Sequence, residues 1–384
     1  MTIESGRSLY REVYESLREE ITSGKHPIGD RLPSEQELKA RFGVSTITVK
    51  RSLDLLRADG LVIRRPRLGT VVTNDVARTV PPATGQPLVG CVLPNFDDTF
   101  GTHVLGGLVD ASSMTASIIL KRSMGDRSVE DKLVRDLVSV GMRALILQPS
   151  SSQFAPPSVL ELVTRHFPVV ILDRSFEGVP VSSVSSDNVE AAKLATDHLF
   201  SLGHTQVGLV SSSSPVTTNA DRHEGFLHAH AEFHVPHDPA SDLRTLQSTT
   251  PGSTASSSED IEQLGLHLSA HPELTGFVAT EYSIAVLLYE ACQRLGRDVP
   301  RDLSIICFDH PDPFPSSMFH FTHMQQDQMR MGACALECAL AQIGEPESIK
   351  KISLPTQLVA GGSTARPEQL KRADVRTRQR AAIR

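Results

Sequence analysis

Residues 32–65 read LPSEQELKARFGVSTITVKRSLDLLRADGLVIRR, and this stretch decides the fold of the first part of the chain. Ser34 is followed three residues later by Glu37, which is the spacing of a capping box at the start of a helix. Gly43 ends this helix, because glycine readily adopts the left-handed conformation at a helix C-terminus, and Ser45 caps the next helix. The stretch therefore predicts two helices separated by a tight glycine turn.

The second predicted helix, over 45–58, has one apolar and one polar face. Its inward positions are Val49, Leu53 and Leu56. The positions that face away are Thr46, Thr48, Lys50 and Arg51. Behind this helix, two β-branched runs flank RRPRLG at 64–69 and predict a hairpin with a cationic tip. This order is that of a winged helix-turn-helix, whose second helix enters the DNA major groove while Arg64, Arg65 and Arg67 on the wing meet phosphates or the minor groove.

A helix precedes this stretch and a linker follows it. Over 9–24, apolar residues recur at helical spacing, at Leu9, Val13, Leu17 and Ile21. Residues 72–88 hold three prolines and several small polar residues between two periodic regions, which indicates an interdomain linker. We therefore expect a winged helix-turn-helix domain over 1–73, a linker over 74–87 and a second domain over 88–365.

Composition narrows the class of protein. The chain has 384 residues, 39% of them hydrophobic and 22% charged, which excludes wholesale disorder and collagen-like repeats. No apolar run approaches the roughly 18 residues of a membrane span, and the acidic residues among the first twenty exclude a signal peptide, so we expect the chain in the cytoplasm. The five cysteines include no CxxC pair, so neither a disulfide framework nor a zinc knuckle is expected.

The net charge of −7 is unevenly distributed. Residues 1–78 hold 14 Lys and Arg against 11 Asp and Glu, residues 366–384 hold 7 against 2, and the region between them is acidic. This asymmetry suggests a polyanion-binding head on an acidic body. We expect the basic tail at 366–384 to be disordered.

The quoted stretch and LGTVV at 68–72 resemble the DNA-binding domain of GntR-type bacterial transcription regulators, over nearly all of residues 8–73. That family usually has arginine where this chain has Gln36, Thr46 and Lys50, and a Gly-Arg-Gly wing tip where this chain has residues 67–69. The resemblance therefore places these positions on DNA but carries over no base preference, and a lysine at position 50 reads guanine more loosely than an arginine does. The residues expected at DNA are Ser34, Gln36, Ser45, Thr46, Thr48, Lys50, Arg51, Arg65, Arg67 and Gly69.

From residue 88 onward, short apolar runs alternate with helical patterns. The runs are LVGCVLP, ASIILK, ALILQP, FPVVILD, VGLVSS, GFVAT and LSIICFD. Continuous apolar runs spaced by helices indicate parallel strands buried on both faces, so the predicted fold class is α/β with doubly wound sheets. Ligands of such sheets bind beyond the carboxyl ends of the strands. The candidate site residues are therefore Asn95 to Phe100, Lys121, Gln148, Asp173, Thr280 with Glu281, and Asp309 with His310.

Catalytic and cofactor sites are not indicated. The chain contains no GxGxxG or GxxxxGK[ST] phosphate loop, no GxSxG elbow and no HExxH helix, so we expect neither an enzyme nor a cofactor. Five histidines crowd residues 223–237, and His230 and His234 have the i, i+4 spacing of zinc ligands on a helix. The alternative is a histidine-rich surface helix that runs into a loop, and we expect no metal site there.

Five strings of the body resemble, in the family's own order, the periplasmic-binding-protein-like effector core of LacI/GalR-type regulators. They are SSDNVEAAKLATDHLFSLGHTQVGLV, DRHEGF, VPRDLSIICFDH, FTHMQQDQMRMG and LPTQLVAGGST. The resemblance implies two lobes that close over a small molecule, usually a sugar. It places the N-terminal lobe at 88–185 and 325–347, and the C-terminal lobe at 186–324 and 348–365.

On the motifs of this second family, the effector contacts fall on Phe100, Asp173, Arg222, Thr280 and Asp309. Aspartates accept hydrogen bonds from vicinal hydroxyls, and an arginine donates to sugar oxygens. Thr280 and Glu281 stand where the family has Asn-Asp, and the chain has no Trp, so an aromatic face for a sugar must come from Phe or Tyr. Residues 238–258 are a low-complexity stretch where the family has a shorter connection, and we expect a mobile loop there.

A GntR-type head on a LacI-type core resembles the arabinose-responsive repressors of some bacteria. We therefore predict a homodimeric transcriptional repressor that a small molecule, a sugar, releases from double-stranded operator DNA. The alternatives are an activator, a binding protein for sugar transport, and a cytoplasmic sugar-binding or sugar-processing protein of doubly wound fold. The effector and the operator are not readable from the sequence.

Overall fold

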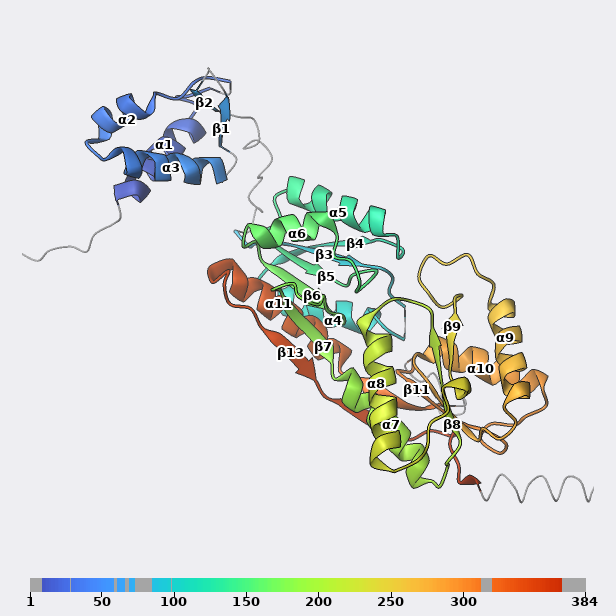
Figure 1. Cartoon of the computed structure of the whole chain (residues 1–384). Coiled ribbons are helices and arrows are strands. Elements are labelled where there is room, and N and C mark those ends of the chain that lie inside the picture. The colour runs from blue at the N-terminus through green and yellow to red at the C-terminus, as the bar shows by residue number, and fades with distance from the viewer. Residues whose placement is uncertain are drawn as a thin grey trace, which may run out of the picture. The chain divides into compact units, whose positions relative to one another are not determined.

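The computed structural model describes residues 9–27, 29–58, 61–65, 69–72, 85–97, 99–311 and 320–367. The chain forms two compact units, residues 1–83 and 84–384 (Figure 1). The expected linker at 74–87 and the basic tail at 366–384 fall almost entirely outside the described residues. No helix in the described part of the chain combines the length and the apolar character that crossing a membrane requires.

The first unit has the predicted winged helix-turn-helix architecture. Its elements are α1 (Leu9–Thr22), α2 (Glu35–Phe42), α3 (Thr46–Ala58), β1 (Val62–Arg65) and β2 (Gly69–Val72), with the two strands antiparallel. The capping box at α2 is present, because Ser34 Oγ accepts from the Glu37 amide at 3.3 Å and the Ser34 amide donates to the Glu37 carboxylate at 2.7 Å. Gly43 ends α2 with φ of 64°. The predicted inward residues of α3 are all buried, in one core with α1, α2 and the hairpin.

The N-terminal lobe of the second unit is a parallel sheet covered by helices on both faces. Its strands, in spatial order, are β13 (Lys351–Leu354), β7 (Ser182–Ser186), β6 (Val169–Leu172), β5 (Ala144–Leu147), β3 (Leu88–Leu93) and β4 (Ser117–Arg122). The helices α4 (Thr102–Ser112) and α11 (Gln328–Gly344) pack on one face. The other face is covered by α5 (Arg127–Ser139) and α6 (Pro157–Thr164).

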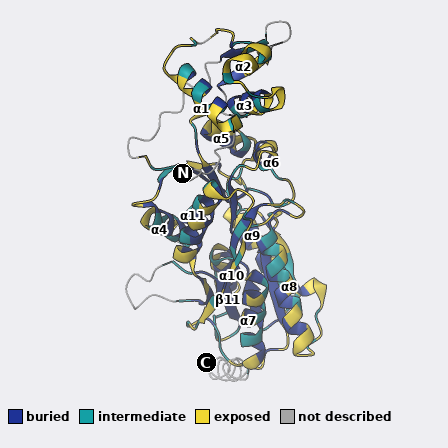
Figure 2. Ribbon diagram, turned by 90° about the vertical axis from the view of Figure 1, so that its left-hand side faces the viewer, coloured by how far each residue is buried: buried dark blue, intermediate teal, exposed yellow. Residues whose placement is uncertain are grey.

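The C-terminal lobe repeats this plan. Its strand order is β14 (Thr356–Val359), β12 (Thr322–Gln326), β11 (Ser304–Phe308), β10 (Gly276–Ala279), β8 (Val207–Ser212) and β9 (Leu243–Leu246). Among the described strands of this sheet, β14 alone pairs antiparallel with its neighbour. The helices α7 (Asn188–Ser201) and α8 (Thr217–Glu232) cover one face, and α9 (Ser257–Ala270) and α10 (Tyr282–Arg294) cover the other. Burial on both faces explains why these strands read as continuous apolar runs, and Figure 2 shows the buried ribbons between the helical layers.

The chain crosses between the lobes three times, after β7, after β12 and after β13. The Asp187 amide donates to the Leu354 carbonyl at 2.9 Å, which ties the first crossover to the third. We expected residues 348–365 in the C-terminal lobe, but 351–354 pair in parallel with β7 and belong to the N-terminal sheet. The crossover therefore lies later in the chain, at residue 355.

Two further expectations differ from the structure. The strand β7, with sequence SSVSS, was not predicted because serine has a low strand propensity, and tertiary burial of its alternate residues outweighs that preference. The stretch 238–258, where we expected a mobile loop, contains a 3₁₀ turn at η2 (Pro239–Ser241), the strand β9 and a hydrogen-bonded turn at 248–253. All five cysteines are free and buried.

Candidate functional site

The polar face of α3 presents side chains to solvent in the first unit. Gln36 on α2 and Thr46 and Lys50 on α3 are exposed, and Thr46 and Lys50 are four residues apart on one face. Ile47 is 80% exposed beside them, although its size and hydrophobicity favour burial. A branched apolar side chain at that place can contact a thymine methyl in the major groove. The sequence already indicates this exposure, because Ile47 lies off the inward apolar stripe of α3.

Four of the remaining DNA candidates make contacts within the first unit. The Ser34 and Ser45 hydroxyls cap α2 and α3, and Ser45 Oγ lies 2.8 Å from Thr48 Oγ1, so these three hydroxyls are already engaged within the unit. The Arg51 guanidinium lies over the Tyr10 ring at 4.3 Å, which holds it against α1. On the wing, the Arg65 side chain and Arg67 lie outside the described residues.

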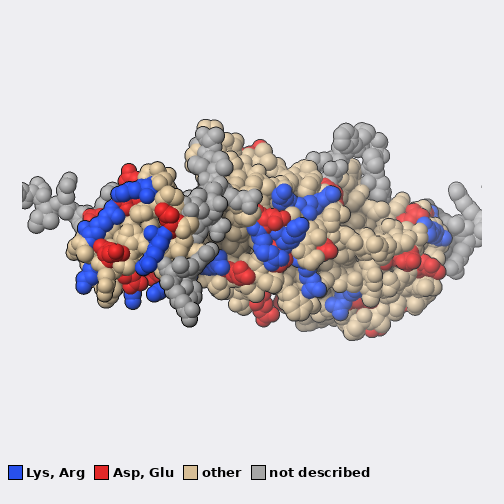
Figure 3. All heavy atoms as spheres, turned by 90° about the horizontal axis from the view of Figure 1, so that it is seen from above, with Lys and Arg blue, Asp and Glu red and all other residues tan. Residues whose placement is uncertain are grey.

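Gly69 opens β2 with φ of 90°, and a Cβ there would come within 3.0 Å of the Arg31 side chain. Arg31 is exposed next to the wing and is a cation that the sequence analysis did not select. In the view of Figure 3, the Lys and Arg side chains of the first unit are interspersed with acidic ones.

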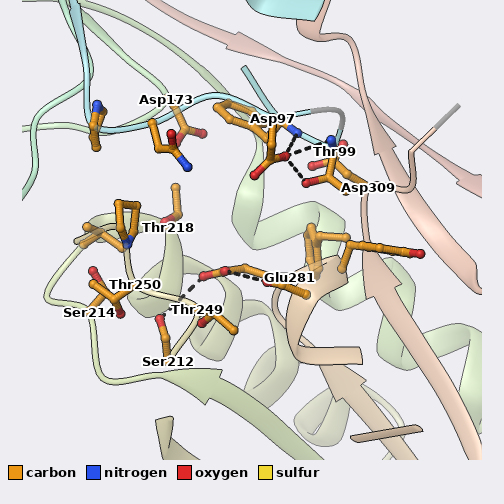
Figure 4. Close-up of a pocket in the computed structure, with 18 of the residues that line it drawn as sticks. Asp97, Thr99, Asp173, Ser212, Ser214, Thr218, Thr249, Thr250, Glu281 and Asp309 are labelled. Carbon is orange, nitrogen blue, oxygen red and sulfur yellow. Dashed lines mark hydrogen bonds between the residues drawn. The ribbon is translucent and has the colours of Figure 1, made fainter. Parts of the chain in front are cut away.

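The second unit encloses a cavity of about 390 Å³ between its two lobes, at the carboxyl ends of the strands. Of the residues predicted from those strand ends, Asn95, Asp97, Thr99, Phe100, Gln148, Asp173, Glu281 and Asp309 line it. Arg222 from α8 lines it as well. Lys121, Thr280 and His310 do not. Figure 4 shows Asp97, Asp173 and Asp309 across the cavity from Ser212, Ser214, Thr249 and Thr250, with Glu281 beside Ser212.

Arg222 is a buried cation in the lining of this cavity. Its Nε donates to Asn188 Oδ1 at 2.8 Å, and its Nη1 donates to the carbonyl oxygen of Thr280. Its guanidinium also lies 3.9 Å from the centre of the Phe308 ring. Thr280 is not among the residues that line the cavity, because its side chain is fully buried and its carbonyl oxygen accepts from Arg222, so its contact with the effector stays a prediction. Asn188 begins α7 directly after the first crossover between the lobes, so the hydrogen bond from Arg222 to Asn188 links the cavity lining to that crossover.

Asp173 and Asp309 occupy equivalent places, one in each lobe. Each follows a strand, β6 or β11, with positive φ of 63° and 57°, which turns the side chain into the cavity. Asp173 Oδ2 accepts from Gln148 Nε2 at 2.8 Å. Asp309 accepts from Gln326 at 2.5 Å and from Gln328 at 3.2 Å, and Gln328 begins α11 of the opposite lobe. Asp309 therefore contacts both lobes.

Carboxyl groups outnumber guanidinium groups in the lining of the cavity. Its lining contains the carboxylates of Asp97, Asp173, Glu281 and Asp309 and the guanidinium groups of Arg174 and Arg222. Burial raises the pKa of Asp309 and of Glu281, and it lowers the pKa of both arginines, which remain protonated near neutral pH. The excess of carboxylates disfavours an anionic ligand. The hydroxyl groups of a neutral ligand can donate hydrogen bonds to the carboxylates and accept hydrogen bonds from the arginines. Arg174 was not selected from the sequence, although it directly follows Asp173.

Aromatic side chains complete the lining. Phe100 and Phe308 come from opposite lobes, and Tyr282 stands at the start of α10. Phe100 and Tyr282 give the cavity apolar surface, whereas the Phe308 ring is 1% exposed and packs against the Arg222 guanidinium.

The histidine-rich segment forms a polar cluster outside this cavity. His223 Nε2 and His237 Nε2 lie 3.2 and 3.4 Å from Asp242 Oδ2. In the described part of the chain, these three side chains are the group of possible ligands that lie close enough together to hold a metal ion. However, Arg244 Nη1 lies 3.2 Å from His223 Nδ1 and can only donate, so His223 carries its proton on Nε2 and donates to Asp242. The geometry is that of a hydrogen-bonded cluster. The predicted pair of His230 and His234 is not part of it.

Asp221, one residue before Arg222, gives a pH-dependent prediction. Burial, reinforced by the charge of Glu224, raises its pKa to about 6 from the ordinary 3.8. Because the pKa of Asp221 is higher in the folded state than in the unfolded state, its contribution to folding stability is present at low pH and is lost as pH rises through about 6. Asp221→Asn should therefore raise the melting midpoint by several degrees near pH 7.5, with the gain shrinking toward pH 4. Thermal melts of the full chain measure this, with exposed Asp136→Asn as control, and an equal gain at all pH values would contradict it.

Comparison with known proteins agrees with both units. Residues 9–72 match the model of bacterial regulatory proteins of the gntR family, and residues 196–364 match that of a periplasmic binding protein-like domain. The chain is 25% identical over 347 residues to the arabinose metabolism transcriptional repressor of Geobacillus stearothermophilus, covering 89% of this chain and 93% of that protein. It is 24% identical over 333 residues to the ribose operon repressor of Halalkalibacterium halodurans, covering 86% of this chain and 95% of that protein.

Solved structures share the fold of the second unit. A LacI family transcriptional regulator from Enterococcus faecium with bound ribose superposes with a TM-score of 0.60 at 24% identity, covering 73% of this chain and 99% of that one. The complex of the transcriptional regulator CelR with cellobiose superposes with a TM-score of 0.63 at 18% identity, covering 83% and 91%. The chain therefore joins a domain that matches the gntR family of bacterial regulatory proteins to a periplasmic binding protein-like domain.

Proposed function

We propose that this chain is a transcriptional repressor that releases its operator when a neutral sugar binds between the lobes of its second unit. The observation that carries the proposal is the cavity in which buried Arg222 stands among Asp173, Glu281 and Asp309, in the same chain as a winged helix with an exposed recognition face. Hydroxyl groups can serve both the donors and the acceptors of this lining. The relatives named as arabinose and ribose repressors support the same class of effector.

The proposed mechanism couples the two units by dimerisation. Two copies place two α3 helices on the half-sites of a roughly palindromic operator in the cytoplasm. Sugar bound to Asp173 of one lobe and Asp309 of the other favours the closed arrangement of the lobes, and this changes how the two winged helices are presented. A coupling free energy of about 1 to 3 kcal/mol would change operator affinity by roughly 5- to 150-fold.

The test is a thermal melt of the full chain against neutral pentoses, hexoses and disaccharides, alongside sugar acids and sugar phosphates. A ligand at about 100 times its dissociation constant stabilises the folded state by about 2.7 kcal/mol, which shifts the midpoint by several degrees. We expect a selective shift with a neutral sugar, and the same sugar should release DNA fragments that the chain selects from a random library. The sugar should be recovered unchanged after incubation. A shift with sugar acids or phosphates alone would overturn the neutral class.

A further inference from the structure

The connection between β9 and α9 reaches across the cavity to the opposite lobe. Residues Ser248–Ser253 all line the cavity, and they leave the C-terminal lobe to meet a turn of the N-terminal lobe at Met124–Gly125 (Figure 1). A Cβ on Gly252 would lie 2.0 Å from the Met124 carbonyl oxygen, and a Cβ on Gly125 would lie 2.3 Å from the Pro251 carbonyl oxygen. The two turns therefore pack backbone against backbone, at a distance that only glycine allows.

The base of this connection is anchored in its own lobe. The carboxylate of Asp260 on α9, which is 4% exposed, accepts from the Gln247 amide at 3.1 Å and from the Ser248 amide at 2.7 Å. The Ser248 hydroxyl donates to the same carboxylate at 2.6 Å. Within the turn, the Ser253 amide donates to the Thr250 carbonyl at 3.0 Å. A buried carboxylate with these donors gives the segment a definite conformation, despite its linker-like composition.

Two hydroxyl groups of the segment lack partners. The Oγ1 atoms of Thr249 and Thr250 are buried and make no hydrogen bond to any described residue. In Figure 4 both threonines lie with Ser212 and Ser214, opposite Asp97 and Asp173. Burying an unpaired hydroxyl costs free energy, and a hydroxyl-bearing ligand in the cavity can supply the missing partner after a small movement of the turn.

We propose that residues 248–253 form a strap that joins the two lobes over the cavity and presents the Thr249 and Thr250 hydroxyls to the bound sugar. The contact of Pro251–Gly252 with Met124–Gly125 holds the strap closed, so a sugar enters and leaves when that contact opens. The hydroxyl contacts rest on the proposed function, whereas the contact between lobes does not.

The contact between lobes is tested without any sugar. Gly252→Ala adds a Cβ at 2.0 Å from a carbonyl oxygen, whereas Gly296→Ala, at a similar positive φ of 68° against 78°, meets nothing within 4 Å. In the full chain, we expect Gly252→Ala to speed amide hydrogen exchange roughly tenfold in both 246–256 and 122–127, and Gly296→Ala to change neither. Unchanged exchange at 122–127 in Gly252→Ala would overturn the strap.

The hydroxyl contacts are tested with ribose and cellobiose as probes. Thr249→Val and Thr250→Val keep the side-chain shape and remove unpaired hydroxyls, so the melting midpoint without sugar should stay the same or rise. Calorimetry on the full chain should show about tenfold weaker binding of the probe that the parent chain binds. Equal affinity in the parent and both variants would overturn the hydroxyl contacts. If the parent chain binds neither probe while the exchange link between the two turns is present, the lobe-joining strap stands and the hydroxyl contacts to ribose and cellobiose fail.

Discussion

Replacing Arg222 with methionine should leave operator binding intact and abolish the response to sugar. Methionine fills the volume of the arginine stem but cannot donate to a ligand, to Asn188 or to the Thr280 carbonyl. Charge-assisted hydrogen bonds contribute about 1.5–3 kcal/mol each, so we expect sugar affinity to fall by at least about 100-fold. DNA binding should persist, because the winged helix has its own hydrophobic core.

The measurement is operator affinity with and without the sugar identified by the thermal melts. The variant should also melt at a lower temperature, because Asp173, Glu281 and Asp309 lose a compensating charge. Arg294→Met is the control, since Arg294 is an exposed arginine of the same lobe that pairs with Glu290 at the surface. Normal release of DNA by sugar in Arg222→Met would show that the effector binds elsewhere.

Lys50→Glu should weaken operator binding by about 100-fold without unfolding the first unit. Lys50 is exposed on the polar face of α3, so the change places a carboxylate against the DNA instead of a cation. A loss of about 1.4 kcal/mol at each of two half-sites gives this factor. The slope of log affinity against log salt should become shallower by about one for each half-site.

A matched substitution separates this local effect from net charge. Arg18→Glu makes the same change of charge on an exposed position of α1 and should weaken binding far less. Affinity and its salt slope are measured by titrating labelled operator at several salt concentrations. Equal losses for the two variants would mean that Lys50 acts through the overall field and not from the groove.

Much of the fold was predictable because its signals are local. The capping box of Ser34 and Glu37, the left-handed Gly43 and the inward stripe of α3 involve residues a few positions apart, and all three are present. The apolar runs likewise became buried parallel strands, because a strand covered by helices on both faces has no polar face to show. The carboxyl ends of those strands correctly indicated where the cavity lies.

Contacts between distant residues could not be predicted. Thr280 follows a strand as Asp173 and Asp309 do, but its side chain is buried and its carbonyl holds Arg222, 58 residues away in sequence. The polar strand β7 forms because neighbouring strands pair with both of its edges. The linker-like composition of 248–253 gave no sign that its backbone contacts Met124 and Gly125.

The sequence by itself therefore determined the helices of the first unit, the apolar strands and the two kinds of unit, since caps, periodicity and motif order are properties of neighbouring residues. Only the tertiary structure decided which lobe holds β13, what Arg222 binds and what crosses the cavity. These features depend on close contacts between segments that lie far apart in the sequence. Such contacts are set by packing and by the pairing of buried polar groups, which no local pattern records.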